Sequence, residues 1–177
     1  TPYDAKGLLT HSLRQNHPVM FLEHKHLYMT KGMVPEEDYE IEFGKAEVIT
    51  EGDDVTIVAW SHMLLKAMEA AETLTAENIQ AEVINLRTLS PLDTDTIMKS
   101  VAKTNRVVIA QEAVRRGGVA SDIASYIHQE EFYSLDAPIE IVAGLNIPIP
   151  FNLNLEKASV PQADDIAAAA KRTLEHA

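Results

Sequence analysis

The sequence contains no cysteine, which excludes disulfides, thiolate zinc sites, iron–sulfur clusters and cysteine nucleophiles. It is also poor in basic residues: 15 Lys and Arg stand against 27 Asp and Glu, so the net charge is −12. Nucleic-acid binding needs a basic surface, and we therefore expect no nucleic-acid partner. No apolar run approaches the roughly 20 residues that cross a membrane, so we expect no membrane contact. The acidic balance favours solubility or a basic protein partner.

The length of 177 residues suits one domain, or one domain plus a fragment, at the usual ~100–200 residues per domain. Hydrophobic residues make up 46% and charged residues 24%, which is ordinary globular composition. The sequence opens on a helix-start pattern at residues 1–4 rather than on Met. We therefore expect it to be part of a longer chain.

The first 44 residues differ from the rest. A capping Thr1, followed by Pro2, predicts a helix over 1–15. A short apolar run predicts a strand over 19–23. Residues 24–44 show no helical or strand period, which is typical of a linker.

From residue 45 onward, short apolar runs alternate with segments of helical spacing. Strands are predicted over 46–49, 55–60, 79–86, 106–110 and 139–142, and helices over 61–74, 90–101, 119–129 and 161–174. The first two strands flank a turn and indicate a hairpin-like pair with one antiparallel edge strand. This alternation predicts a three-layer α/β/α sandwich with a mostly parallel sheet.

One strand-to-helix turn offers a possible anion site. Gly117-Gly118 follows a strand and opens a helix, and Arg115-Arg116 precede it. Neither the GxGxxG nor the GxxxxGK pattern is present. We therefore interpret the glycine pair as a tight turn, and predict no cofactor-binding residue in this chain.

Histidines form the second candidate group. His24 and His26 stand two apart beside Glu23, a spacing that can indicate a metal site. No further ligands follow at a family spacing, so we interpret both as surface histidines of the linker. His62 follows Ser61, but neighbours in sequence do not make a catalytic pair without an orienting acid. We predict neither metal ligands nor catalytic residues in this chain.

Two further features indicate partner surfaces. Glu130, Glu131, Asp136 and Glu140 form a locally acidic stretch, which is either solvated surface or the contact for a basic partner. Residues 145–151 form an apolar loop that contains two prolines, a composition that often packs at an interface.

Several sequence segments resemble those of a known family. The most specific is Arg-Thr-x-x-Pro-x-Asp at Arg87, Thr88, Pro91 and Asp93. The other matching segments are 4–9, 16–19, 21–23, 27–28, 44–48, 52–59, 81–93, 100–104, 111–113 and 135–139. Together they resemble the beta subunit of the thiamine-diphosphate-dependent decarboxylating component of 2-oxo acid dehydrogenase complexes, of the pyruvate, branched-chain or acetoin type. From residue 44 the resemblance is to the transketolase-type C-terminal domain.

The resemblance implies a division of the chain. Residues 1–23 would be the tail of the thiamine-binding pyrimidine domain, 24–44 the linker, and 45–177 the transketolase-type C-terminal domain. The family's activating glutamate and catalytic histidine would precede Thr1, so the chain alone is expected to bind no thiamine diphosphate and to be inactive.

The resemblance also implies the parent activity. The parent enzyme would decarboxylate a 2-oxo acid, pyruvate by expectation, with thiamine diphosphate and Mg, and would pass the acyl group to a lipoyl domain. One alternative is the C-terminal domain of a transketolase or deoxyxylulose-phosphate-synthase-type enzyme. Another is a free-standing nucleotide-binding module, which the missing Gly-rich fingerprint disfavours. The expected location is the bacterial cytoplasm, or the mitochondrial matrix in a eukaryote.

Partners follow from the same resemblance: the alpha subunit, a second beta subunit, and the peripheral-subunit-binding domain of the acyltransferase core. Asp136 and Glu140 match acids that meet this basic domain in related complexes. The family's C-terminus also takes part, but residues 174–177 lack the bulky apolar end of some relatives.

The contact between beta subunits is predicted from the apolar loop. We place Ile147, Pro148, Pro150 and Phe151, with the helix after Gly118, at or near a two-fold interface.

Overall fold

The computed structural model describes residues 1–175 and contains one five-stranded sheet in the order β1-β3-β2-β4-β5. The strands are β1 (Glu47–Thr50), β2 (Val55–Ala59), β3 (Ala81–Asn85), β4 (Val107–Val114) and β5 (Glu140–Gly144). β2 pairs in parallel with β3 and β4, and β4 pairs in parallel with β5. β1 is the antiparallel edge strand, which confirms the predicted fold class.

The predicted hairpin between the first two strands is wrong, because β1 pairs with β3 instead. β2 lies between two parallel neighbours, and every one of its residues is buried. β1 is only half-buried along its whole length, which suits the edge position.

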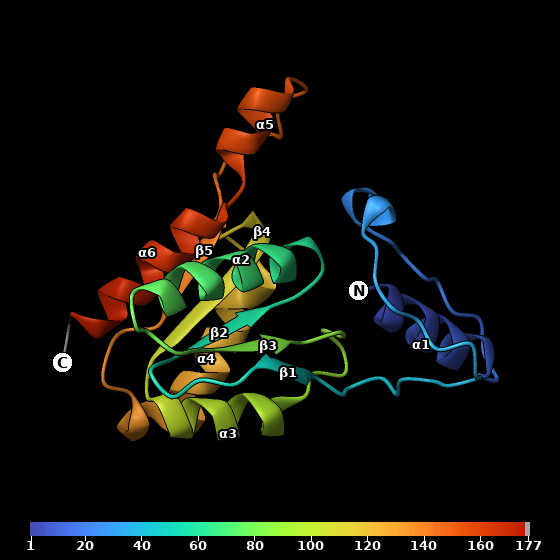
Figure 1. Ribbon diagram of the computed structural model, residues 1–177, viewed down its shortest axis with the longest axis horizontal. Helices are drawn as coiled ribbons and strands as arrows, with labels where there is room; N and C mark the ends of the chain where they lie inside the picture. The colour runs from blue at the N-terminus through green and yellow to red at the C-terminus, as the bar shows by residue number, and fades with distance from the viewer. Residues whose placement is uncertain (176–177) are drawn as a thin grey trace.

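Helices cover both faces of the sheet (Figure 1). α2 (His62–Ala76) and α6 (Ala163–Leu174) pack together on one face, and α3 (Thr94–Thr104) and α4 (Val119–Glu131) on the other. Side chains of β2 alternate between the layers: Val55 and Ile57 join the core under α2 and α6, and Val58 joins the core under α3 and α4. The three predicted layers are therefore present.

The helix predicted from residue 90 begins later, at Thr94. Asp93 is its N-cap and accepts a hydrogen bond from the Thr96 backbone N–H at 3.1 Å. Ser90 and Pro91 instead belong to the preceding loop and are joined by a cis peptide bond.

The N-terminal part consists of α1 (Pro2–Leu13), which was predicted, and a long irregular segment. Residues 19–23 are not a strand, so that prediction is wrong: they form no ladder with any described strand, and an unpaired extended segment is not a stable element. The segment predicted as a linker folds back onto α1. The Ile41 backbone N–H donates to the Gly7 carbonyl at 3.1 Å, and Tyr39 stacks on Tyr3.

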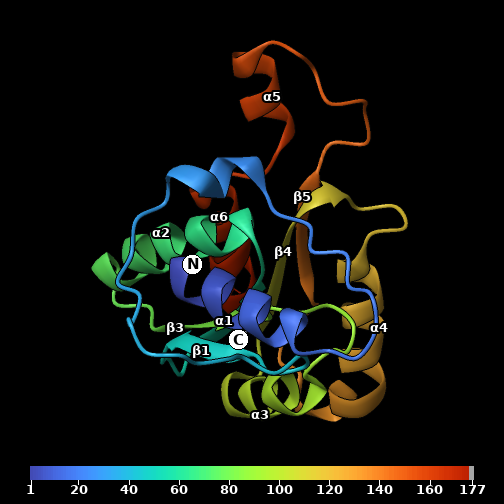
Figure 2. The same ribbon diagram turned by 90° about the vertical axis from the view of Figure 1, so that its right-hand side faces the viewer.

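Three short elements were not predicted: the 3₁₀ turns η1 (Lys25–Met29) and η2 (Phe132–Ser134), and the helix α5 (Leu153–Ser159). Asn152 caps α5 by accepting from the backbone N–H groups of Asn154 and Leu155. Figures 1 and 2 show α5 projecting from the sandwich, at the same end of the molecule as η1. Within residues 1–175, no helix has the length and apolar content that would let it cross a membrane.

Candidate functional site

The strand order defines one place where an open α/β sheet can bind a ligand. From β2 the chain passes through α2 to β3 on one side, and from β3 it passes through α3 to β4 on the other side of β2. The direction of winding therefore changes between β2 and β4. The crevice outside the carboxyl ends of two such strands is the usual ligand position in this class of fold.

Four titratable side chains lie at this switch point. His62 begins α2 soon after β2 ends, and Glu112 lies in the second half of β4. His24 and His26 come from the start of η1. His24 Nε2 lies 2.8 Å from Glu112 Oε2, and the three imidazole rings have mutual centroid distances of 5.3, 5.4 and 5.5 Å. We call these four residues the histidine cluster.

The environment of His62 favours its neutral form. Burial lowers the pKa of the His62 imidazole, and the nearby His24, His26 and Lys66 lower it further, whereas Glu112 opposes them. The net effect is a pKa below the ordinary histidine value.

From the sequence we considered His24 and His26 together, treated His62 apart from them, and did not consider Glu112 as a site residue. Chain spacing gives no hint of this meeting, because the residues come from an irregular segment, a helix start and a strand. The available signal was topological. His62 follows β2 and Glu112 lies near the end of β4, and these two strands flank the change in winding direction.

The turn at Gly117-Gly118 is tight, as predicted. Gly117 has φ +69°, and the buried Gln111 side chain fills the start of α4. Gln111 Oε1 accepts from the Ala120 backbone N–H at 2.9 Å, and its Nε2 donates to the Val114 carbonyl at 2.8 Å. A Cβ on Gly118 would lie 2.1 Å from Gln111 Nε2. The helix start therefore binds a side chain of its own chain where an anion would otherwise sit.

The predicted interface loop leads into α5. We define residues 145–155 as the apolar arm. Its large hydrophobic side chains are exposed, and Phe151 is fully exposed. They are Leu145, Ile147, Ile149, Phe151, Leu153 and Leu155. An exposed apolar segment of this size is typical of a protein–protein contact.

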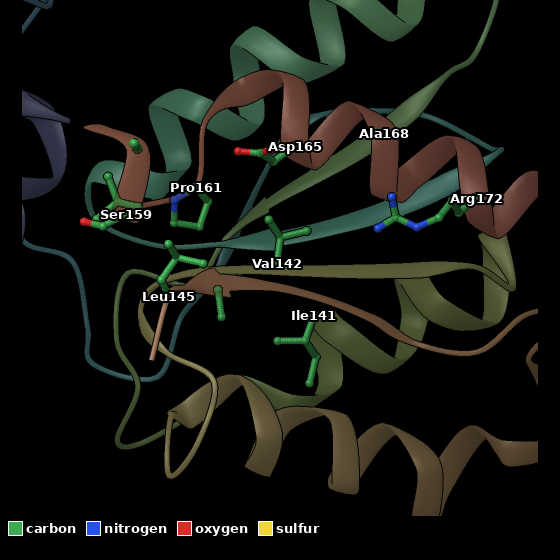
Figure 3. A pocket seen from close by; sticks show the side chains of 11 residues that line it. Ile141, Val142, Leu145, Ser159, Pro161, Asp165, Ala168 and Arg172 are labelled. Carbon is green, nitrogen blue, oxygen red and sulfur yellow. The ribbon is translucent and has the colours of Figure 1, made fainter. Parts of the chain in front are cut away.

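A groove of about 350 Å³ runs beside the apolar arm, along the outer edge of β5. Ile141 and Val142 of β5 line one side, Ser159 and Pro161 lie near its end at α5, and Arg172 of α6 lies at the other end (Figure 3). β5 is the last strand of the sheet, so this groove borders a strand edge that no described strand covers.

The two predicted partner-binding acids lie at the opposite, amino end of β5. Asp136 Oδ2 is 3.4 Å from Arg106 Nη1, and the Arg172 guanidinium donates to Glu140 at 2.8 Å. The hydrogen bond and charge of Glu140 raise the pKa of Arg172. The Asp136 side chain remains about half exposed. Both acids are thus available at the surface, but each has an arginine of this chain beside it.

The fold and a family match together define the class of this protein. Residues 44–166 match the model described as "Transketolase, C-terminal domain", which covers more than half of the chain. The chain therefore belongs to the transketolase C-terminal domain family.

More particular likenesses come from individual proteins. The chain is 48% identical over 174 residues to the acetoin:2,6-dichlorophenolindophenol oxidoreductase subunit beta of Cupriavidus necator, covering 98% of this chain and 52% of that protein. It is also 48% identical to the pyruvate dehydrogenase E1 component subunit beta of Rickettsia felis, covering 97% of this chain and 53% of that one. The chain thus spans about half the length of these curated relatives.

A solved structure gives the same class. A split-gene transketolase, described as an inactive beta4 tetramer, shares 34% identity and a TM-score of 0.69, covering 81% of this chain and 46% of that one.

Proposed function

We propose that this chain is the C-terminal half of the beta subunit of a thiamine-dependent 2-oxo acid dehydrogenase component, and that it serves assembly. The observation that carries the proposal is the 48% identity to two such beta subunits over nearly the whole chain. The exposed apolar arm supports it, because a domain that works in a multi-subunit enzyme needs apolar contact surface.

In this proposal the whole enzyme decarboxylates a 2-oxo acid, with pyruvate as the first candidate, and passes the acyl group to a lipoyl arm. Thiamine diphosphate would supply the electron sink for that step. The start of α4, a strand-to-helix turn with paired glycines, is filled by the Gln111 side chain and so offers no free position for a phosphate group. We therefore assign no thiamine diphosphate or Mg ligand to this chain, and no chemical step.

The division of labour within the chain is part of the same proposal. Residues 1–23 belong to the end of a preceding pyrimidine domain, 24–44 join the two domains, and 45–177 form the assembly domain. The close packing of 39–41 on α1 supports a joint that is fixed rather than loose. The alpha subunit, a second beta subunit and the acyltransferase core are the proposed partners, in the bacterial cytoplasm.

A transketolase-type enzyme is the second candidate, favoured by the 34% identity to the split-gene transketolase. The two candidates differ in substrate. One consumes a 2-oxo acid and releases carbon dioxide, and the other moves a ketol group between sugar phosphates.

The test uses the natural subunit that carries these residues, co-purified with its alpha subunit. We expect thiamine-dependent release of carbon dioxide from pyruvate, with reduction of 2,6-dichlorophenolindophenol. Ketol transfer without decarboxylation would replace the proposal by its alternative. The 177-residue chain alone should show no binding of thiamine diphosphate by calorimetry, and micromolar binding would contradict the assembly role.

A further inference from the structure

We propose that His24, His62 and Glu112 form a binding site for one zinc-type divalent cation at the switch point of the sheet, with His26 beside them. This inference goes beyond the proposed function and does not depend on it. One ligand atom from each of the three residues lies within 4.8 Å of the other two. Among residues 1–175, this is the one group of histidines and carboxylates close enough to hold a metal ion.

The donor set selects the class of ion. Two imidazole nitrogens and one carboxylate oxygen suit zinc and its neighbours cobalt and nickel, whereas magnesium and calcium prefer sites made of oxygen alone. Three protein ligands and one open position are typical of zinc sites that also hold water or a fourth side chain.

Most distances between the three ligand atoms are longer than those in an occupied metal site. Zinc–nitrogen and zinc–oxygen bonds of about 2.1 Å place neighbouring tetrahedral ligand atoms roughly 3.4 Å apart. The His24–Glu112 pair is already closer than that, at 2.8 Å. The other pairs of donors lie within 4.8 Å of each other, so they must approach by up to about 1.4 Å, a movement that side-chain rotation supplies. The side chains of His24 and Glu112 are only partly buried, so this rotation is not blocked by core packing.

The tautomer of His24 also has to change. Its Nδ1 accepts the His26 backbone N–H at 3.2 Å, which leaves the ring proton on Nε2, facing Glu112. A cation on Nε2 moves that proton to Nδ1, so one long hydrogen bond to the backbone is lost. In exchange the Glu112 carboxylate faces a cation instead of an N–H.

His26 lies on the exposed side of the site and is the candidate for a fourth ligand. The His26 ring lies about equally far from the His24 and His62 rings, with centroid distances of 5.5 and 5.4 Å. His26 Nε2 also lies 3.7 Å from Glu156 Oε1 in α5. A bound ion would therefore connect η1 with the carboxyl ends of β2 and β4. Through His26 and Glu156 it would also reach α5, the helix in which the apolar arm ends.

The position of the cluster in the fold also supports a cation here. The crevice at the carboxyl ends of β2 and β4 is the ligand position that the topology itself defines.

The experiment is titration of the 177-residue chain, without a polyhistidine tag and after chelator treatment, with zinc chloride in a calorimeter at pH 7.5. We expect one zinc ion per chain at micromolar affinity or tighter. The same zinc concentration should raise the melting temperature, because an ion that binds only the folded state stabilises it. Cobalt should give the absorption of a tetrahedral nitrogen and oxygen site.

The variants are Glu112→Gln and His62→Gln, which keep shape while removing a ligand. Each should weaken zinc binding by more than the roughly 10–100-fold loss typical of a change outside the ligand shell. Circular dichroism checks that the fold is kept, and Glu112→Gln serves if His62→Gln unfolds. The matched controls are His17→Gln and His128→Gln, which remove histidines outside the cluster and should bind as the unchanged chain does.

Two outcomes would contradict the proposed zinc site. Equal binding by the unchanged chain and by Glu112→Gln would mean that zinc binds adventitiously to the surface. No binding at 100-micromolar zinc would leave the cluster as a histidine–glutamate hydrogen bond only and would equally overturn the site.

Discussion

Arg87 donates a hydrogen bond from Nε to Asp4 Oδ1 at 2.7 Å, and both side chains are buried. Asn85 Nδ2 donates to the other Asp4 oxygen at 2.9 Å, and the Arg87 guanidinium also pairs with Glu47. Asp4 lies in α1, whereas Asn85 ends β3 and Glu47 begins β1. One buried ionic network thus attaches the N-terminal helix to the edge of the sheet.

We predict that Arg87→Ala lowers the free energy of unfolding by about 3 kcal/mol, because it leaves the Asp4 carboxylate buried without its cation. Urea denaturation followed by circular dichroism measures the loss. Arg14→Ala is the control: it removes an arginine that pairs with Asp38 and Glu40 at the surface, and such pairs contribute at most about 1 kcal/mol. Equal losses in the two variants would show that the Arg87 network has no special role.

The same network predicts that the free energy of unfolding falls at acidic pH. Burial alone raises the pKa of Asp4, but the Thr1 hydroxyl and the Arg87 charge outweigh it, so the pKa lies below its ordinary value. The unfolded state therefore binds the proton more readily than the folded state. The stability that ionised Asp4 contributes is fully present above its unfolded-state pKa of about 4. It is lost as the pH falls through the lower pKa that Asp4 has in the folded state.

Asp4→Asn removes that titration. We expect the unchanged chain to lose more unfolding free energy between pH 6 and pH 3 than Asp4→Asn does, in urea titrations at each pH. The variant starts from a lower stability at pH 6, because the buried Arg87 loses its anion. Parallel pH curves for the two proteins would contradict the assigned role of Asp4.

The alternation from residue 45 was enough to predict the layers. β2, β3 and the first half of β4 are short segments that are buried on both faces, and the helices carry one apolar stripe. Strand order was less accessible. Pairing of β1 with β3 rather than β2 is a long-range choice that neither strand encodes locally. Residues 19–23 have strand composition, yet composition does not supply a neighbouring strand.

The candidate site divides in the same way. The apolar loop and the acids of 136–140 could be found because each is a local run of one residue type. The histidine cluster is not a local run, because His24 and Glu112 meet only through the tertiary fold, and finding it needs the strand order as well as the sequence. The predicted role of the C-terminal residues falls partly on 176 and 177, which lie outside the described residues.

The apolar arm predicts self-association of the chain. Ile147→Asp with Phe151→Asp places two charges on an exposed apolar surface and should reduce the dimer fraction in sedimentation velocity, with little change in melting temperature because neither side chain is buried. Tyr133→Asp is the control, since Tyr133 is equally exposed but lies in η2, outside the arm. A strict monomer at high concentration for the unchanged chain would contradict the prediction.

The acids at the amino end of β5 predict how the acyltransferase core is bound. The arginines beside Asp136 and Glu140 reduce the negative field at this surface, so removing one should strengthen attraction to a basic domain. We expect Arg172→Gln, which frees Glu140, to bind an isolated peripheral-subunit-binding domain more tightly than the unchanged chain at low salt. The double reversal Asp136→Lys with Glu140→Lys should bind more weakly, and added salt should shrink both differences. Asp38→Lys is the matched control, because it also breaks a surface pair with an arginine but lies in the segment that folds on α1. If the double reversal binds as the unchanged chain does, the partner contacts another surface.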